Sequence, residues 1–149
     1  SGIGSIFDQQ IKDEELRKKK AEAEAAINAE AEAVKVVGAA VDTMRTQINN
    51  VTAARTSLNE NRKDKQTRIK AENLCEQAFN AITEEYRNSL KLLEEKDKHK
   101  ITVKEATDIE SILKKEVASL RELIAKVKSE NSLGGKLRGW LNDLMEDDN

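Results

Sequence analysis

With 149 residues, the chain has the length of a single domain. It contains no proline, and its aromatic residues make up only 3% and its charged residues 36% of the sequence, a composition typical of long helices and coiled coils. The 26 basic and 28 acidic residues nearly cancel, which argues against a protein that holds nucleic acid or an anionic membrane through its overall field. We therefore expect a thin aliphatic core between long helices.

The first predicted helix covers residues 6–58 and follows a flexible start at residues 1–5. Ser5, with Asp8 three residues later, matches a variant of the capping box that begins helices. The first half of this helix is rich in alanine and has high helix propensity. The second half carries apolar residues in alternating steps of three and four, which is the period of a coiled coil. Its stripe consists of Ile27, Val34, Val37, Val41, Met44, Ile48, Val51 and Leu58.

The polar run at residues 59–67 predicts the first reversal of the chain, with Ser57 and Glu60 as a second capping box. Because the run contains no glycine or proline, a continuous helix through it is the alternative. The second predicted helix covers residues 64–96. Its apolar stripe consists of Cys75, Phe79, Ile82, Tyr86 and Leu93.

The third predicted helix covers residues 103–131. Thr102 and Glu105 form the clearest capping box in the chain, and the residues from Asn131 to Gly135 end the helix. Because short connections make consecutive helices antiparallel neighbours, we predict an all-α, elongated antiparallel three-helix bundle with coiled-coil-like packing. The first helix is longer than its partners, so its alanine-rich half must project, pair with the C-terminal segment or bind another chain. The stripe of the third helix consists of Ala106, Leu113, Val117, Leu120, Ile124 and Val127.

A short amphipathic helix is predicted at residues 136–146, followed by an acidic tail at 147–149. An indole beside leucines and two cations suits a membrane surface or a groove on a partner. We expect this segment to fold back and bury Trp140 against the end of the bundle, because an isolated helix of about three turns is marginal. If the segment is exposed instead, its candidate contact residues are Leu137, Trp140, Leu141, Leu144, Lys136 and Arg138.

A second candidate surface is the densest run of positive charge, between residues 62 and 70. It could bind an anionic partner, but no aromatic residue interrupts it and acidic residues flank it on both sides. We therefore expect an exposed face of a helix and turn. The residues of this basic patch are Arg62, Lys63, Lys65, Arg68 and Lys70.

The residues that catalysis or metal binding would need are scarce. Cys75 and His99 are the only cysteine and histidine. Cys75 lies on an apolar stripe, where we expect a buried structural thiol, and His99 lies in a charged run, where we expect a solvated side chain. No glycine-rich phosphate loop and no inward-facing Glu-x-x-His pair occurs. We expect no enzyme activity, no cofactor and no metal site.

The sequence thus favours a non-catalytic helical module that binds a protein partner, or itself, through its helix faces, as in bacterial surface, secreted or phage components. The alternative is a membrane-active or membrane-remodelling protein that uses the C-terminal amphipathic segment. We expect no nucleic-acid partner and no small-molecule substrate. Because the chain starts with Ser1 and Gly2 rather than methionine, a leader could have been removed, so we favour a secreted or cell-surface location over the cytoplasm.

Overall fold

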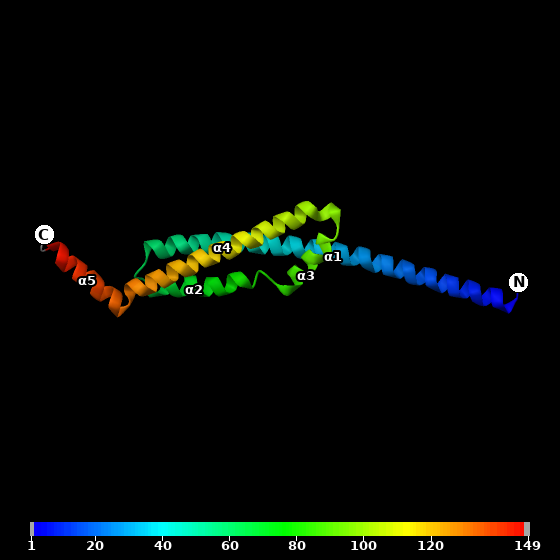
Figure 1. Cartoon of the computed structure of the whole chain (residues 1–149), viewed down its shortest axis with the longest axis horizontal. Helices are drawn as coiled ribbons and strands as arrows, with labels where there is room; N and C mark the ends of the chain where they lie inside the picture. Colours follow the sequence, from blue (N-terminus) through cyan, green and yellow to red (C-terminus); the bar gives the residue numbers. More distant parts are fainter. Residues whose placement is uncertain (1, 148–149) are drawn as a thin grey trace.

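The computed structural model describes residues 2–147, with the backbone alone at residues 133 and 147, and every element in it is helical. The all-α prediction is therefore confirmed. Figure 1 shows a rod from which one helix projects at each end. The elements in chain order are α1 (Ile3–Glu60), α2 (Lys65–Phe79), α3 (Glu84–Glu94), the 3-10 helix η1 (Asp97–His99), α4 (Lys100–Asn131) and α5 (Leu133–Asp147).

Three helical layers form the bundle, and ion pairs between them show how the chain runs. Along α1 and α4 the pairs Arg45–Glu105 and Arg55–Glu116 ascend together in number. Glu72 of α2 pairs with Lys128 of α4, whereas Arg87 of α3 pairs with Glu110 of α4. Residue numbers therefore rise along α2 and α3 while the numbers of their partners in α4 fall. α1 and α4 therefore run parallel, and the α2–α3 layer runs antiparallel to both of them (Figure 1).

The core is a narrow aliphatic seam at the centre of these three layers. Its largest fully buried side chains include Tyr86, Met44, Leu58, Leu113 and Leu120. The predicted stripe of the third helix is buried in full, but the buried stripe of the first helix begins at Ala33 rather than at Ile27. Ala33 is buried, whereas Val34 is 39% exposed and Ile27 is 66% exposed.

The first and third predicted helices both begin earlier than expected. α1 begins at Ile3 with Gly2 at its N-cap position, so Ser5 caps nothing and the predicted start at residue 6 is too late. α4 begins at Lys100, which places Thr102 inside the helix, and Glu105 pairs with Arg45 instead of closing a capping box.

The reversal after α1 lies where the polar run predicts it, and the continuous-helix alternative is excluded. The cap is not the predicted Ser57 and Glu60, however, because both residues belong to α1. Asp64 caps α2 instead: its carboxylate accepts hydrogen bonds from the backbone N–H of Gln66 at 3.2 Å and from the Thr67 hydroxyl at 2.7 Å. These hydrogen bonds lower the pKa of Asp64, the bond from Thr67 having the larger effect.

The predicted helix at residues 64–96 is in fact two helices. α2 ends at Phe79 and α3 begins at Glu84, where the Thr83 hydroxyl accepts a hydrogen bond from the backbone N–H of Tyr86 at 3.0 Å. Glu84 and Glu85 then fill the first turn of α3, where negative charge is favoured by the helix dipole. Tyr86, in the first turn of α3, is fully buried in the core.

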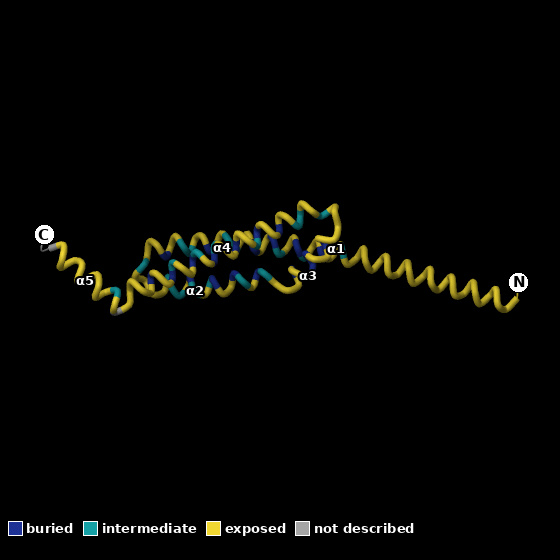
Figure 2. Tube along the Cα trace, viewed as in Figure 1, coloured by how far each residue is buried: buried dark blue, intermediate teal, exposed yellow. Residues whose placement is uncertain are grey.

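α5 does not fold back on the bundle. Figure 2 shows it projecting, exposed, beyond the end of α4, and Trp140 is 58% exposed. The expectation that Trp140 is buried against the bundle is therefore wrong. The helix spans residues 133–147 rather than 136–146, and the last two residues of the predicted acidic tail lie outside the described residues.

The direction of α5 is set at Gly135. A Cβ atom on this residue would lie 2.2 Å from the backbone oxygen of Ser129, so only glycine permits this close approach of α5 to the last turn of α4. Ser132 begins the new helix, because its hydroxyl accepts a hydrogen bond from the backbone N–H of Gly135 at 3.2 Å. Gly135 thus shapes the corner between α4 and α5.

Candidate partner-binding surfaces

The first candidate surface is the part of α1 that extends beyond the bundle, here called the overhang and defined as residues 3–29. Every side chain in the overhang is exposed, and Figure 2 shows it as a single helix with no neighbour. At 1.5 Å per residue it is roughly 40 Å long. Its exposed large apolar side chains are Ile3, Ile6, Phe7, Ile11, Leu16 and Ile27.

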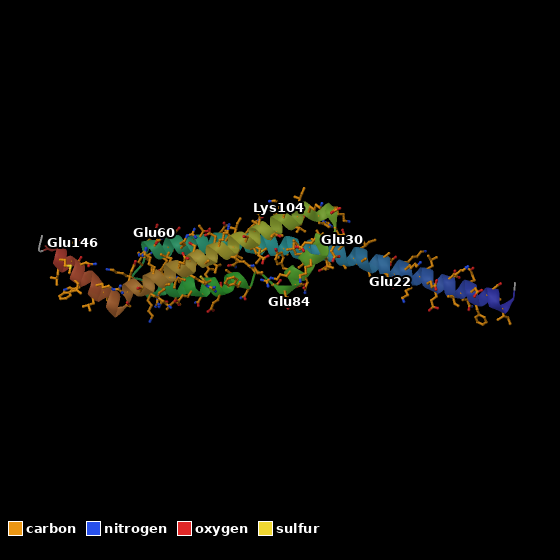
Figure 3. All side chains as sticks on the ribbon, in the orientation of Figure 1. Glu22, Glu30, Glu60, Glu84, Lys104 and Glu146 are labelled. Atoms are coloured by element: carbon orange, nitrogen blue, oxygen red, sulfur yellow. The ribbon has the colours of Figure 1, made fainter. Side chains whose placement is uncertain are left out.

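A polar cluster marks the point where the overhang meets the bundle (Figure 3). Glu30 is bound by Lys98 at 2.5 Å and by His99 at 2.8 Å, and the side chains of Glu30 and His99 are only 20% and 18% exposed. The prediction of a solvated His99 is therefore wrong. Hydrogen bonds, first from Lys98 and then from His99, lower the pKa of Glu30 to about 2. This cluster fixes the η1 corner to α1.

The second candidate surface is the apolar side of α5. Its residues recur in steps of three and four, so they share one face of the helix. The four apolar side chains predicted to make contacts are all exposed. The exposed fraction of the surface is 55% for Leu137, 58% for Trp140, 43% for Leu141 and 44% for Leu144. Lys136 and Arg138 are exposed beside them. The overhang and this α5 face lie at opposite ends of the rod (Figure 1).

The basic patch does not form one surface. Arg62, Lys63, Lys65 and Arg68 line a hollow of about 260 Å³ together with Lys128 of α4, but Lys70 lies in a different groove. Three of the cations that line it form ion pairs with nearby carboxylates, Arg62 with Glu130, and Arg68 and Lys128 with Glu72.

Arg62 makes the strongest of these contacts. Its guanidinium donates hydrogen bonds to both carboxylate oxygens of Glu130, at 2.6 and 3.0 Å. These bonds raise the pKa of Arg62 and lower the pKa of Glu130. The Glu72 carboxylate forms ion pairs with Lys128 at 2.8 Å and with Arg68 at 3.8 Å. The patch therefore holds the end of α4 against the α1–α2 turn.

Two hollows were not predicted. A shallow groove of about 580 Å³ lies between α1 and α2, with Ala53, Ala54 and Leu74 in its walls. A second hollow, of about 370 Å³, lies where α1 passes the α2–α3 corner. Neither has a sequence signature, because each is formed by residues from segments far apart in the chain.

The residues that a catalytic pair would need are separated. Cys75 is 3% exposed in α2, and burial raises the pKa of its thiol. His99 contacts Glu30 at the opposite end of the α2–α3 layer. Within residues 2–147, no cluster of three or more His, Cys, Asp or Glu side chains has the geometry of a metal site. In the same range, no helix is both long and apolar enough to cross a membrane.

Comparisons with protein-family models, with curated proteins and with solved structures find no match. The function of the chain must therefore be inferred from its own surfaces.

Proposed function

We propose that this chain is a non-catalytic helical module that binds a protein partner through the overhang of α1. One observation carries the proposal: α1 continues as a helix for residues 3–29 although no described side chain there is buried. Isolated helices gain little stability in water, and most helical stability in proteins comes from packing of an amphipathic face. A helix that exposes six large apolar side chains over this length is suited to packing against another helix.

The remainder of the molecule is suited to hold this overhang in place. Near the overhang, α1 is held to α4 by the Arg45–Glu105 ion pair and to the η1 corner by the Glu30 cluster. The small aliphatic core gives a narrow rod rather than a wide pocket. The bundle thus presents the overhang as an exposed helix at a distance from its own core.

Site-specific photo-crosslinking in cells that express the full chain tests the proposal. A photoreactive phenylalanine analogue is placed at Phe7 in the overhang, and in a control chain at Lys115, which is exposed on α4. We expect a covalent adduct of defined mass, with this chain or another protein, from position 7 and not from position 115. Equal labelling at both positions, or no adduct from position 7, contradicts the proposal.

A second proposal, that the chain acts at membranes, is favoured by the exposed apolar face of α5. Amphipathic helices with an indole on the apolar side lie in lipid interfaces. However, the described acidic residues Asp143 and Glu146 share α5 with Lys136 and Arg138, so anionic lipid adds little attraction. Burial of the apolar face would have to drive the binding.

Trp140 makes this second proposal easy to test, because it is the only tryptophan in the chain. If α5 enters a membrane, zwitterionic vesicles shift the Trp140 fluorescence to shorter wavelength, and the full chain floats with the vesicles. A variant without residues 133–149 is then expected to remain in the soluble fraction. An unchanged spectrum, or flotation that survives the truncation, contradicts the membrane function.

A further inference from the structure

One face of α1 runs without interruption from the overhang onto the bundle. Its residues follow one another in steps of three and four, with a mean period close to that of a straight α-helix. All of them are exposed except Val36, which is half-buried. The residues of this docking face are Ile3, Phe7, Ile11, Glu14, Lys18, Ala21, Ala25, Ala29, Glu32, Val36, Ala39 and Thr43.

The two ends of the docking face are complementary in shape. Phe7 and Ile11 stand out near the N-terminus, with 57% and 56% of their surface exposed. At the other end lies the hollow of about 370 Å³ beside the α2–α3 corner. Its walls are apolar at Val36, Ala39, Ala40 and Ala81, and its edge carries the polar residues Thr43, Asn80, Thr83 and Glu85. The face therefore carries apolar projections at one end and an apolar recess at the other.

We propose that a second copy of this chain occupies the docking face, with its α1 antiparallel to the first and Ala25 at the twofold axis. This inference rests on the proposed function and names the partner. In this arrangement Phe7 lies level with Thr43 of the second copy, and Ile11 lies level with Ala39. Each copy thus places its two exposed apolar side chains over the hollow of the other, which is the reciprocal contact that twofold symmetry requires.

Charge complementarity selects this register. Lys18 lies level with Glu32 of the second copy, so the dimer gains this ion pair twice. Glu14 lies level with Val36, next to the exposed Lys35. An overlap shorter by one heptad would place Lys18 opposite an alanine and Ile11 opposite Glu32.

A parallel dimer is disfavoured by the same residues. It would place Glu14, Lys18 and Glu32 each opposite its own copy, and like charges held against one another are costly. It would also leave the hollow empty, because Phe7 would face Phe7. Ala21, Ala25 and Ala29 have a steric role in the antiparallel form, since their small side chains let the two backbones approach. The overlap from residue 7 to residue 43 is roughly 55 Å long.

Disulfide trapping in the full chain tests the geometry. Ala25→Cys places a thiol at the twofold axis and is expected to form a covalent dimer under mild oxidation, whereas the control Ala23→Cys places one on the opposite side of the helix. A mixture of Lys18→Cys and Glu32→Cys chains is expected to form mixed dimers, and Lys18→Cys alone is expected to form none. The native Cys75 does not interfere, because it is 3% exposed.

Sedimentation equilibrium tests the energetics. Lys18→Glu turns two attractive pairs into repulsive ones and is expected to raise the dimer dissociation constant about tenfold, and adding Glu32→Lys is expected to restore it to within about threefold. Phe7→Ala is expected to raise the constant about tenfold or more, since it removes the side chain that fills the hollow. The control Leu16→Ala, which is similarly exposed but lies off the docking face, is expected to change it less than twofold or so.

The results separate the identity of the partner from the proposed function. Trapping at position 25 but not at position 23, together with rescue by the charge exchange, supports the antiparallel dimer. A monomer at the highest soluble concentration, equal trapping at both positions, or strong trapping of Lys18→Cys alone overturns it. If the chain is monomeric while position 7 crosslinks to another protein in cells, the dimer fails and the proposed function stands; if position 7 crosslinks to nothing, both fail.

Discussion

The two halves of α1 have the same backbone conformation but different means of support. From Ala33 to Leu58 the helix buries a seam against α2, α3 and α4. In the overhang, the helix is supported by helix propensity and by local contacts, such as the hydrogen bond from Gln9 to Asp13 at 3.0 Å. A helix can therefore continue far beyond its core. The comparison predicts a low free energy of local opening in the overhang and a high one in the bundle.

The largest contrast is expected from removing a leucine in each region. Leu113→Ala deletes a fully buried side chain of α4 and is expected to lower the free energy of unfolding by about 3 kcal/mol. Leu16→Ala removes a side chain that is 53% exposed, and is expected to change it by less than about 0.5 kcal/mol. Urea denaturation followed by circular dichroism measures both. Equal losses would show that the overhang belongs to the cooperative unit.

A smaller effect is expected from the one tyrosine, which lies in the core at the start of α3. The Tyr86 hydroxyl donates a hydrogen bond to the backbone oxygen of Ala106 at 3.1 Å, and its burial raises the pKa of the phenol to about 12. Tyr86→Phe is expected to cost about 1 kcal/mol. Spectrophotometric titration of the wild-type phenol gives an independent check, since a midpoint near 10 would contradict the buried position.

Acid is expected to weaken the junction between the two halves. Because the pKa of Glu30 is lowered from 4.5 to about 2, its contribution to stability is complete above about pH 4.5 and is lost as the pH falls through about 2. The difference in unfolding free energy between wild type and Glu30→Gln should therefore shrink over this range. Glu22→Gln removes an equal charge from the overhang and serves as the control, with little effect expected at any of these pH values. If the difference in unfolding free energy between wild type and Glu30→Gln does not change with pH, the ionised Glu30 does not stabilise the junction between the overhang and the bundle.

The smallest effect on stability, and the clearest on shape, is expected from Gly135→Ala. The added Cβ cannot be accommodated against the Ser129 carbonyl, so α5 must turn to a new direction while the bundle is unchanged. The distance between spin labels on α4 and α5 should shift, and the melting temperature should not. An unchanged distance would show that the corner is not fixed at Gly135.

Periodicity predicted the fold class and the buried face of α4 because side chains in steps of three and four must share one side of a helix. The break at residues 80–83 was missed, although Thr83 followed by two glutamates is a recognisable helix start. The capping box at Thr102 was a false signal, since α4 already begins at Lys100 and Glu105 pairs with Arg45 across the bundle. Local patterns alone cannot weigh such a contact.

The candidate surfaces were only partly predictable. The apolar stripe of α5 follows from its sequence, but its direction depends on a close approach at Gly135 that no pattern reveals. The environment of His99 depends on Glu30, which is distant in the sequence, and the hollow beside the α2–α3 corner exists only because the predicted second helix is broken there. A feature formed by two segments that are far apart in the sequence can be recognised only when the fold is known.

The central claim is that α1 is one continuous helix whose packed part is far more stable against local opening than its overhang. Hydrogen–deuterium exchange of the α1 backbone amides, at a concentration where the chain is monomeric, tests this most directly. Slow exchange from about residue 33 onward, with fast exchange between residues 7 and 29, is the expected result. Uniform protection along the whole of α1 in the monomer would contradict the claim, because it would mean that the overhang has support within its own chain.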